Sequence, residues 1–190
     1  REMNLRKSER GYSFLELIVV IGMITVILGM ALVSTSSLLP AFRANSAMDQ
    51  VYGQLRAARA IAISQRREVQ VQFILPNQIQ LTRLDQPTGT TDLGTIILEG
   101  KAEFQVFVGV PDTPMTFGNA AGVYFGGMSG GPPIMKFNST GGFVDAGSNP
   151  INGTVFVGLT GRQDTARAVT VLGATGRVRQ YHWTGSQWME

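Results

Sequence analysis

Cysteine is absent from this sequence and histidine occurs once, at His182, so several kinds of chemistry are excluded at the outset. Without cysteine the chain has no disulfide framework, no thiol nucleophile and no cysteine-containing metal site. One histidine between Tyr181 and Trp183 cannot form a metal cluster, and such a residue is more often part of a half-buried strand. The carboxylates are spread over different loops, without an evident acid and base pair. We therefore predict no catalytic residue, no cofactor and no metal ion, and the chain is not expected to be an enzyme.

One stretch does match a hydrolase motif. Residues 127–131 have the sequence Gly-Met-Ser-Gly-Gly, and Asp145 or Asp164 and then His182 follow in the order of a catalytic triad. That motif requires a helix directly after the serine, whereas Pro132 and Pro133 follow here. A Gly-Lys-Ser/Thr sequence is also missing, so a phosphate-binding loop is excluded. We interpret residues 126–133 as a flexible loop.

A large charge imbalance is lacking too. The formal net charge is +3, but residues 1–11 contribute four basic and two acidic side chains to it. Residues 12–190 hold 12 basic and 11 acidic side chains. Bulk charge is therefore weak evidence for a nucleic-acid or other acidic partner.

The sequence does contain a long uncharged run, from Leu17 to Val33. At a rise of about 1.5 Å per residue, a helix over residues 12–33 would be about 33 Å long and could span a bilayer core. Because it is apolar on every face, it needs lipid or a bundle of similar helices. Four basic residues precede it within residues 1–11, which predicts a cytoplasmic N-terminus with the rest of the chain outside.

Glu16 is a feature that ordinary membrane anchors lack. A lone carboxylate at the edge of a membrane-spanning helix costs several kcal/mol unless it is paired. If the chain were cut after Gly11, the new amine of Tyr12 would lie near the same membrane face as Glu16. A neighbouring copy could then offer its amine to this carboxylate and neutralise both charges inside a helical bundle.

Gly11 followed by Tyr-Ser-Phe-Leu-Glu resembles the cleavage motif of prepilins. The resemblance implies a leader at residues 1–11, cleavage by a prepilin peptidase between Gly11 and Tyr12, and methylation of the Tyr12 amine. It also implies that Glu16 is the glutamate that sets subunit register during filament assembly. The sequence departs from the usual pattern in having Tyr12 in place of phenylalanine and Val33 where many major pilins have proline.

Residues 34–66 continue as an amphipathic helix. Apolar residues recur at three-and-four spacing and are expected to lie on a domain core: Ala44, Ala47, Met48, Val51, Tyr52, Leu55, Ala58, Ile61 and Ala62. The opposite face holds Arg43, Asp49, Arg56 and Arg59, and Arg66 and Arg67 lie at the helix end. These can form a binding patch or, more simply, a solvated face that interacts favourably with the helix dipole.

The remaining chain, residues 67–190, has alternating apolar and polar residues separated by glycine and proline turns, which predicts a β-rich domain. We expect strands at 68–75, 78–83, 94–98, 103–110, 123–125, 134–137, 153–159, 167–172 and 177–183, with a turn-rich loop at 85–92. In the strand at 103–110, Phe104, Val106, Val108 and Val110 should share a face. The predicted fold class is α+β, with a long N-terminal helix at 12–66 packed on an antiparallel, β-sandwich-like domain.

The order of the C-terminal strands is similar to that of the GspH/FimT group of minor pilins. This resemblance covers residues 7–65 and 134–180, and residues 68–133 fit it only in being rich in strands. It implies the pilin fold and a structural subunit of a type II secretion pseudopilus or a type IV pilus. The partners so implied are other pilin subunits, the prepilin peptidase, an inner-membrane assembly platform and, before assembly, membrane lipid. The location so implied is the bacterial inner membrane, with the globular domain in the periplasm, and then the filament.

Arg177 and Arg179 leave an alternative open. Residues two apart on a strand point the same way, about 6.6 Å apart, and can contact neighbouring phosphates. Tyr181 continues that face, and Trp183 and Trp188 are candidates for base stacking. Gly-Arg-Val-Arg at 176–179 matches a segment associated with DNA binding in FimT-type minor pilins, so a DNA-binding subunit for natural transformation is one alternative. The arginines can equally keep an edge strand soluble. A membrane-anchored binding domain that never polymerises is the other alternative.

Overall fold

A computed structural model describes residues 12–85, 87–126 and 134–190, without the side chains of residues 31–37. Its elements follow one another as α1 (Phe14–Gln65), β1 (Val69–Ile74), β2 (Gln78–Leu84), β3 (Thr90–Ile97), η1 (Glu99–Lys101), β4 (Ala102–Phe104), β5 (Val123–Phe125), β6 (Ile134–Phe137), β7 (Phe143–Val144), β8 (Gly153–Leu159), η2 (Gln163–Thr165), β9 (Arg167–Leu172), β10 (Arg177–Trp183) and β11 (Trp188–Met189). The chain divides between Leu39 and Pro40 into two units, which are described separately.

Helix α1 has a defined start and end. At its start, the backbone N–H of Leu17 donates to the carbonyl of Ser13 at 3.1 Å. At its end, Arg66 takes a left-handed conformation with φ of 50°. The N–H of Arg67 then donates to the carbonyl of Ala62 at 3.1 Å, which satisfies a terminal carbonyl as in a Schellman motif. An arginine thus occupies the position that glycine usually holds.

The apolar run in the first unit was predicted to cross a membrane. Among the residues that the structure describes, no helix has a stretch that is long and apolar enough to do so. Residues 31–33, the end of the predicted span, have no described side chains. The leader at residues 1–11 also lies outside the described residues. The membrane span and the leader therefore stay predictions.

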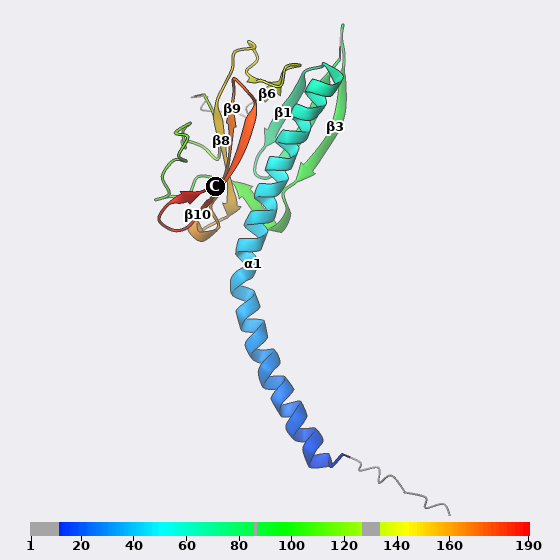
Figure 1. Cartoon of the computed structure of the whole chain (residues 1–190), viewed down its shortest axis with the longest axis vertical. Helices are drawn as coiled ribbons and strands as arrows, with labels where there is room; N and C mark the ends of the chain where they lie inside the picture. The colour runs from blue at the N-terminus through cyan, green and yellow to red at the C-terminus, as the bar shows by residue number, and fades with distance from the viewer. Residues whose placement is uncertain (1–11, 86, 127–133) are drawn as a thin grey trace, which may run out of the picture. The chain divides into compact units, whose positions relative to one another are not determined.

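In the second unit, the described strands form two antiparallel sheets (Figure 1). The first sheet has the order β3-β2-β1-β6-β7, and the second has the order β11-β10-β9-β8-β4, with β5 also paired to β8. The predicted α+β class with antiparallel sheets is confirmed. Strand β9 runs antiparallel between β8 and β10, with Val171 opposite Gly153 on one side and Val178 on the other.

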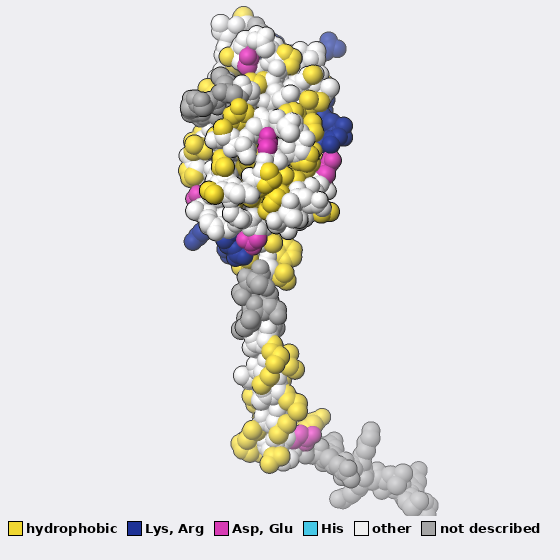
Figure 2. All heavy atoms as spheres, turned by 90° about the vertical axis from the view of Figure 1, so that its left-hand side faces the viewer, with side chains coloured by type: hydrophobic (Ala, Val, Ile, Leu, Met, Phe, Trp, Pro, Cys, Tyr) yellow, Lys and Arg dark blue, Asp and Glu magenta, His cyan; other side chains and the backbone are white. Residues whose placement is uncertain are grey.

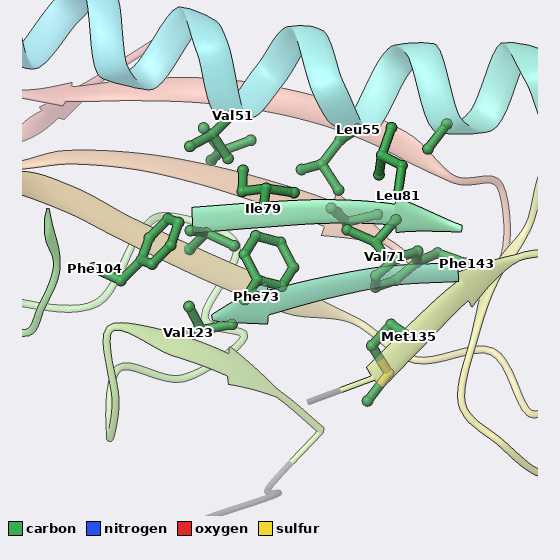
Figure 3. Packing of buried hydrophobic residues seen from close by; sticks show 14 of the residues in the cluster. Val51, Leu55, Val71, Phe73, Ile79, Leu81, Phe104, Val123, Met135 and Phe143 are labelled. Carbon is green, nitrogen blue, oxygen red and sulfur yellow. The ribbon is translucent and has the colours of Figure 1, made fainter. Parts of the chain in front are cut away.

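One apolar core joins the C-terminal half of α1 to both sheets (Figure 3). Val51 and Leu55 of α1 point toward Ile79 and Leu81 of β2, and all four side chains are buried. Phe73 lies deeper, with its ring centroid 5.6 Å from that of Phe104. The helix face predicted from three-and-four spacing is therefore the face that packs on the domain.

A buried arginine adds a polar link between α1 and β9. Arg167 is 6% exposed, and its Nε donates to Oδ1 of Asn45 at 2.6 Å. Its Nη1 donates to the carbonyls of Asp164 and Ala166. Burial lowers the pKa of Arg167, and the nearby charge of Asp164 opposes that shift. These hydrogen bonds offset the cost of burying a guanidinium beside the core.

A second apolar cluster covers the other face of the second sheet. It contains Phe107, Val110, Phe156, Ala168, Tyr181 and Trp183. Because side chains alternate along a strand, the odd-numbered residues of β10 face this cluster, whereas Val178 packs against the main core. The segment that follows β4 supplies the cover.

Two strand predictions were wrong in extent. The expected strand at 103–110 ends at Phe104, and Phe107 and Val110 are buried while Val106 and Val108 are exposed. The reason is that two strands pair with the same edge of β8. Strand β4 pairs with residues 157–159 and β5 pairs with residues 153–155, so β4 cannot continue along that edge. Strand β3 begins at Thr90, inside the expected loop 85–92, because the turn closes early through a hydrogen bond from the N–H of Asp85 to Gly89.

The core assignment makes a testable prediction about two phenylalanines. Phe73→Ala should lower the free energy of unfolding by about 3–5 kcal/mol, because it leaves a cavity among packed rings. Phe42→Ala is the matched control, since Phe42 is 65% exposed, and should change it by less than about 0.5 kcal/mol. Urea unfolding of the full chain in a non-ionic detergent, followed by the fluorescence of Trp183 and Trp188, measures both. Equal effects of the two changes would contradict this assignment.

Candidate functional site

The N-terminal candidate residues lie at and before the start of α1. Glu16 is in the first turn of the helix and is exposed. Tyr12 precedes the helix and is exposed as well. Gly11 lies outside the described residues, so the predicted cleavage site is only partly visible. Near a helix N-terminus a carboxylate is stabilised by the helix dipole, so Glu16 is a favourable place for a negative charge.

The first part of α1, between Phe14 and Met30, leaves its apolar side chains uncovered (Figure 2). Its large hydrophobic residues between Phe14 and Met30 are between 46% and 79% exposed, so no face of this stretch is buried. Among residues 12–30, Glu16 is the sole charged residue. A contiguous apolar surface of this kind is typical of surfaces that bind other proteins or membranes.

The structure places Arg177 and Arg179 on the same face of β10, as predicted from their spacing. Together with Met115, Phe117, Thr170 and Leu172, they line a cavity of about 170 Å³. Arg177 is exposed at the start of the strand. Arg179 is half-buried, and its Nη1 lies 3.1 Å from Oε2 of Glu190. The Tyr181 phenol, and to a smaller extent the Glu190 carboxylate, raise the pKa of Arg179.

The aromatic residues expected beside these arginines are not available for stacking. Tyr181 is 4% exposed and Trp183 is 9% exposed, both within the second cluster. Trp188 packs against Trp183 with ring centroids 5.5 Å apart, and its Nε1 donates to the carbonyl of Pro111. The rings therefore fill the space between β10 and the segment after β4.

Arg177 also borders a larger groove that the sequence did not predict. It has a volume of about 650 Å³, and α1 forms one wall and the β9–β10 turn forms the other. Its lining residues are Tyr52, Arg56, Arg59, Ala60, Ile63, Thr175, Gly176, Arg177 and Val178. Arg56 and Arg59 were predicted to lie on a solvated or binding face. Their neighbour across the groove, Arg177, is more than 100 positions away in sequence, so no local sequence pattern predicts that they come together.

Close backbone packing fixes this wall of the groove. Nε of Arg59 donates to the carbonyl of Gly141 at 3.1 Å. A Cβ at Gly176 would lie 1.9 Å from the same carbonyl oxygen, so the β9–β10 turn touches the turn before β7 directly. Asn138 closes that second turn, since its Oδ1 accepts from the N–H groups of Thr140 and Gly142. The helix and two turns thus meet at one point.

Within residues 12–85, 87–126 and 134–190, no group of three or more histidine, cysteine, aspartate or glutamate residues could hold a metal ion. His182 is half-buried and pairs with Met189 in the sheet. The Gly-x-Ser-x-Gly match at 127–131 lies outside the described residues.

Comparison with known proteins identifies the fold. No family model and no curated protein sequence matches the chain. The structure is similar to the type IV minor pilin FimU of Pseudomonas aeruginosa, with a TM-score of 0.50, 15% identity, and coverage of 77% of this chain and 92% of that one. A minor pseudopilin of the type II secretion system of Vibrio cholerae, EpsH, matches with a TM-score of 0.49, 13% identity, and coverage of 74% and 97%. The likeness to FimU shows that this chain has a pilin-like fold.

The contact between the two turns can be tested with a glycine pair. Gly161→Ala should cost about 1–2 kcal/mol, because Gly161 has a φ of 76° but open space around it. Gly176→Ala, at a φ of 61°, should cost at least about 1 kcal/mol more, because its Cβ meets the Gly141 carbonyl. Urea unfolding of both variants measures the difference. A Gly176 variant no less stable than the Gly161 variant would show that the turns do not touch.

Proposed function

We propose that this chain is a minor pilin or pseudopilin, a structural subunit of a type II secretion pseudopilus or a type IV pilus. The observation that carries the proposal is the combination, in one chain, of a pilin-like fold with an uncovered apolar stretch of α1, between Phe14 and Met30, whose sole charge is Glu16. The fold alone does not decide the function, because one fold can serve many. The helix adds a surface that needs partners of its own kind.

Assembly through α1 gives this helix a thermodynamic role. Each large aliphatic side chain that becomes buried between neighbouring helices contributes about 1.5–3 kcal/mol. Before assembly, lipid can cover the same side chains, with the globular domain on the periplasmic side of the inner membrane. Transfer from lipid to a bundle then depends on the fit of the helices and on polar pairing. The apolar run thus serves both the storage and the assembled form of the subunit.

Glu16 selects the arrangement of the bundle. A carboxylate that enters an apolar bundle without a counter-charge costs several kcal/mol. Cleavage after Gly11 by a prepilin peptidase would create an amine on Tyr12, and the amine of a neighbouring subunit could then pair with Glu16. A shift along the bundle axis would leave both charges unpaired. The carboxylate therefore sets the axial register of the subunit.

The processing step can be tested by mass. The full chain, produced with a prepilin peptidase in a bacterial inner membrane, should lose residues 1–11 and gain one methyl group on Tyr12. Gly11→Ala should remain at its full length, because the peptidase would lack the glycine that the prepilin motif requires. Intact-mass spectrometry distinguishes the two products. An uncut wild-type chain, or equal cutting of the variant, would favour a membrane-anchored domain that does not polymerise.

The register role predicts a different effect for Glu16. Glu16→Gln should be processed normally but should be at least about tenfold depleted from sheared filaments, because it cannot pair with the neighbouring amine. Glu99→Gln, which removes an exposed carboxylate from the globular domain, is the control and should be incorporated like the unmodified chain. Immunoblots of filament and membrane fractions measure both variants. Normal incorporation of the Glu16 variant would refute the register role.

A further inference from the structure

The groove between α1 and the β9–β10 turn has the features of a binding site. Its helix wall is one stripe of α1, formed by Tyr52, Arg56, Arg59, Ala60 and Ile63. The other wall is the turn that leads into β10, and the contact of Gly176 with Gly141 fixes its position. The groove lies entirely within the unit from Pro40 to Glu190. It shares no residue with the helix surface between Phe14 and Met30 that is proposed for assembly.

Positive charge gathers in this groove without a balancing carboxylate. Among the described residues that line it, three are arginines and none is acidic. Four other basic side chains of the domain each have a carboxylate oxygen at 2.7–3.1 Å. Like charges at neighbouring positions on a helix face repel one another, so the Arg56 and Arg59 pair is unfavourable without an anion. The charge pattern points to a negatively charged occupant.

Two of the arginines are held in place by the protein. Arg59 uses its Nε for the carbonyl of Gly141, and within the described part of the chain its terminal nitrogens have no protein acceptor. The guanidinium of Arg56 lies over the ring of Tyr52, with Cζ 5.3 Å from the ring centroid. Nη1 of Arg56 also donates to the Tyr52 hydroxyl at 3.3 Å. A guanidinium fixed in this way loses less conformational entropy when it binds a carboxylate.

Part of the groove lining is apolar. Ala60, Ile63 and Val178 line it together with the arginines, and Ile63 is 44% exposed. An exposed isoleucine between arginines gains free energy when an aliphatic side chain covers it. The groove therefore matches a ligand in which carboxylates and aliphatic groups alternate.

A nucleic acid fits these observations less well than a polypeptide does. Stacking surfaces normally accompany arginines that bind single strands, but Tyr181 and Trp183 are buried in the second cluster, and Tyr52 has Arg56 against its ring. Residues 12–190 hold 12 basic and 11 acidic side chains, without the excess that is typical of nucleic-acid-binding domains.

We propose that this groove binds an acidic segment of a partner polypeptide, in which carboxylates pair with Arg56, Arg59 and Arg177 while aliphatic side chains cover Ile63. Arginine and carboxylate groups form two parallel hydrogen bonds, which gives such a pairing both strength and direction. The site is a recognition surface of the globular domain and does not depend on whether the chain polymerises.

Fluorescence anisotropy tests this proposal with the full chain in a non-ionic detergent. The probe is a dye-labelled peptide of alternating glutamate and leucine, and a glutamine and leucine peptide reports partition into detergent. The acidic peptide should bind saturably and more tightly at low salt. Arg56→Gln with Arg177→Gln should weaken binding at least about tenfold, because two charge-assisted contacts are lost. Arg59 is left unchanged, because it also holds the Gly141 turn.

The matched control is Lys101→Gln with Arg162→Gln. These two exposed residues carry the same total charge as Arg56 and Arg177. Arg162 follows the end of β8 that is farther from the β9–β10 turn. The control should change peptide affinity by less than about twofold, since screened charges at that distance contribute little. Unchanged urea unfolding of both double variants would exclude loss of folding as the cause.

Two results would overturn the proposal. One is acidic-peptide binding that is absent, or that the Arg56 and Arg177 variant leaves intact. The other is tighter binding of a labelled single-stranded DNA at equal salt, lost in the same variant, which would assign the groove to phosphates. Ile63→Asn separates the two ligands, since it should weaken peptide binding about threefold or more by removing an apolar contact and leave DNA binding unchanged.

Discussion

The packing of one stripe of α1 against the two sheets determines the rest of the domain. The stripe is made of small residues at its ends and larger ones at its centre, with Ala44, Ala47, Ala58 and Ala62 on either side of Val51 and Leu55, all buried. Alanine lets a helix approach a sheet closely, while valine and leucine fill the space between the helix and β2 (Figure 3). Once this face is buried, the orientation of the other helix residues between Pro40 and Gln65 follows. Arg56 and Arg59 are thereby turned toward the β9–β10 turn.

Local sequence patterns predicted most of the fold, because in the main elements the spacing of apolar residues matches the side chains that are buried. The strands predicted at 123–125, 134–137, 153–159, 167–172 and 177–183 have the observed bounds. The failure at 103–110 has a nonlocal cause. Apolar and polar residues alternate there as in a strand, but β5 occupies the part of the β8 edge with which a longer β4 would pair. Phe107 and Val110 instead cover the opposite face of the second sheet, an outcome that depends on residues about 50–75 positions away.

The candidate sites show the same division between local and nonlocal information. The spacing of Arg177 and Arg179 correctly predicted a shared face, because that is a property of any strand. The environment of that face did not follow from the sequence, and it includes a carboxylate at Glu190 and aromatic rings that are buried. The groove was missed for a similar reason. A hydrogen bond joins its helix wall, at Arg59, to Gly141, which is 82 positions away, and the β9–β10 turn also packs on Gly141.

Apolar side chains of the same kinds are buried in one unit and exposed in the other. In the domain, aliphatic and aromatic groups are buried, so their hydrophobic free energy is already used in folding. Between Phe14 and Met30 the corresponding groups are exposed in the single chain, so lipid or other helices can still cover them. Such an apolar surface has little specificity by itself, because one aliphatic contact resembles another along the helix axis. A single carboxylate changes this, since the cost of leaving it unpaired is comparable to that of losing one or two buried side chains. In the proposed assembly, affinity therefore comes from the many apolar residues, while one charge, Glu16, decides among the registers that they allow.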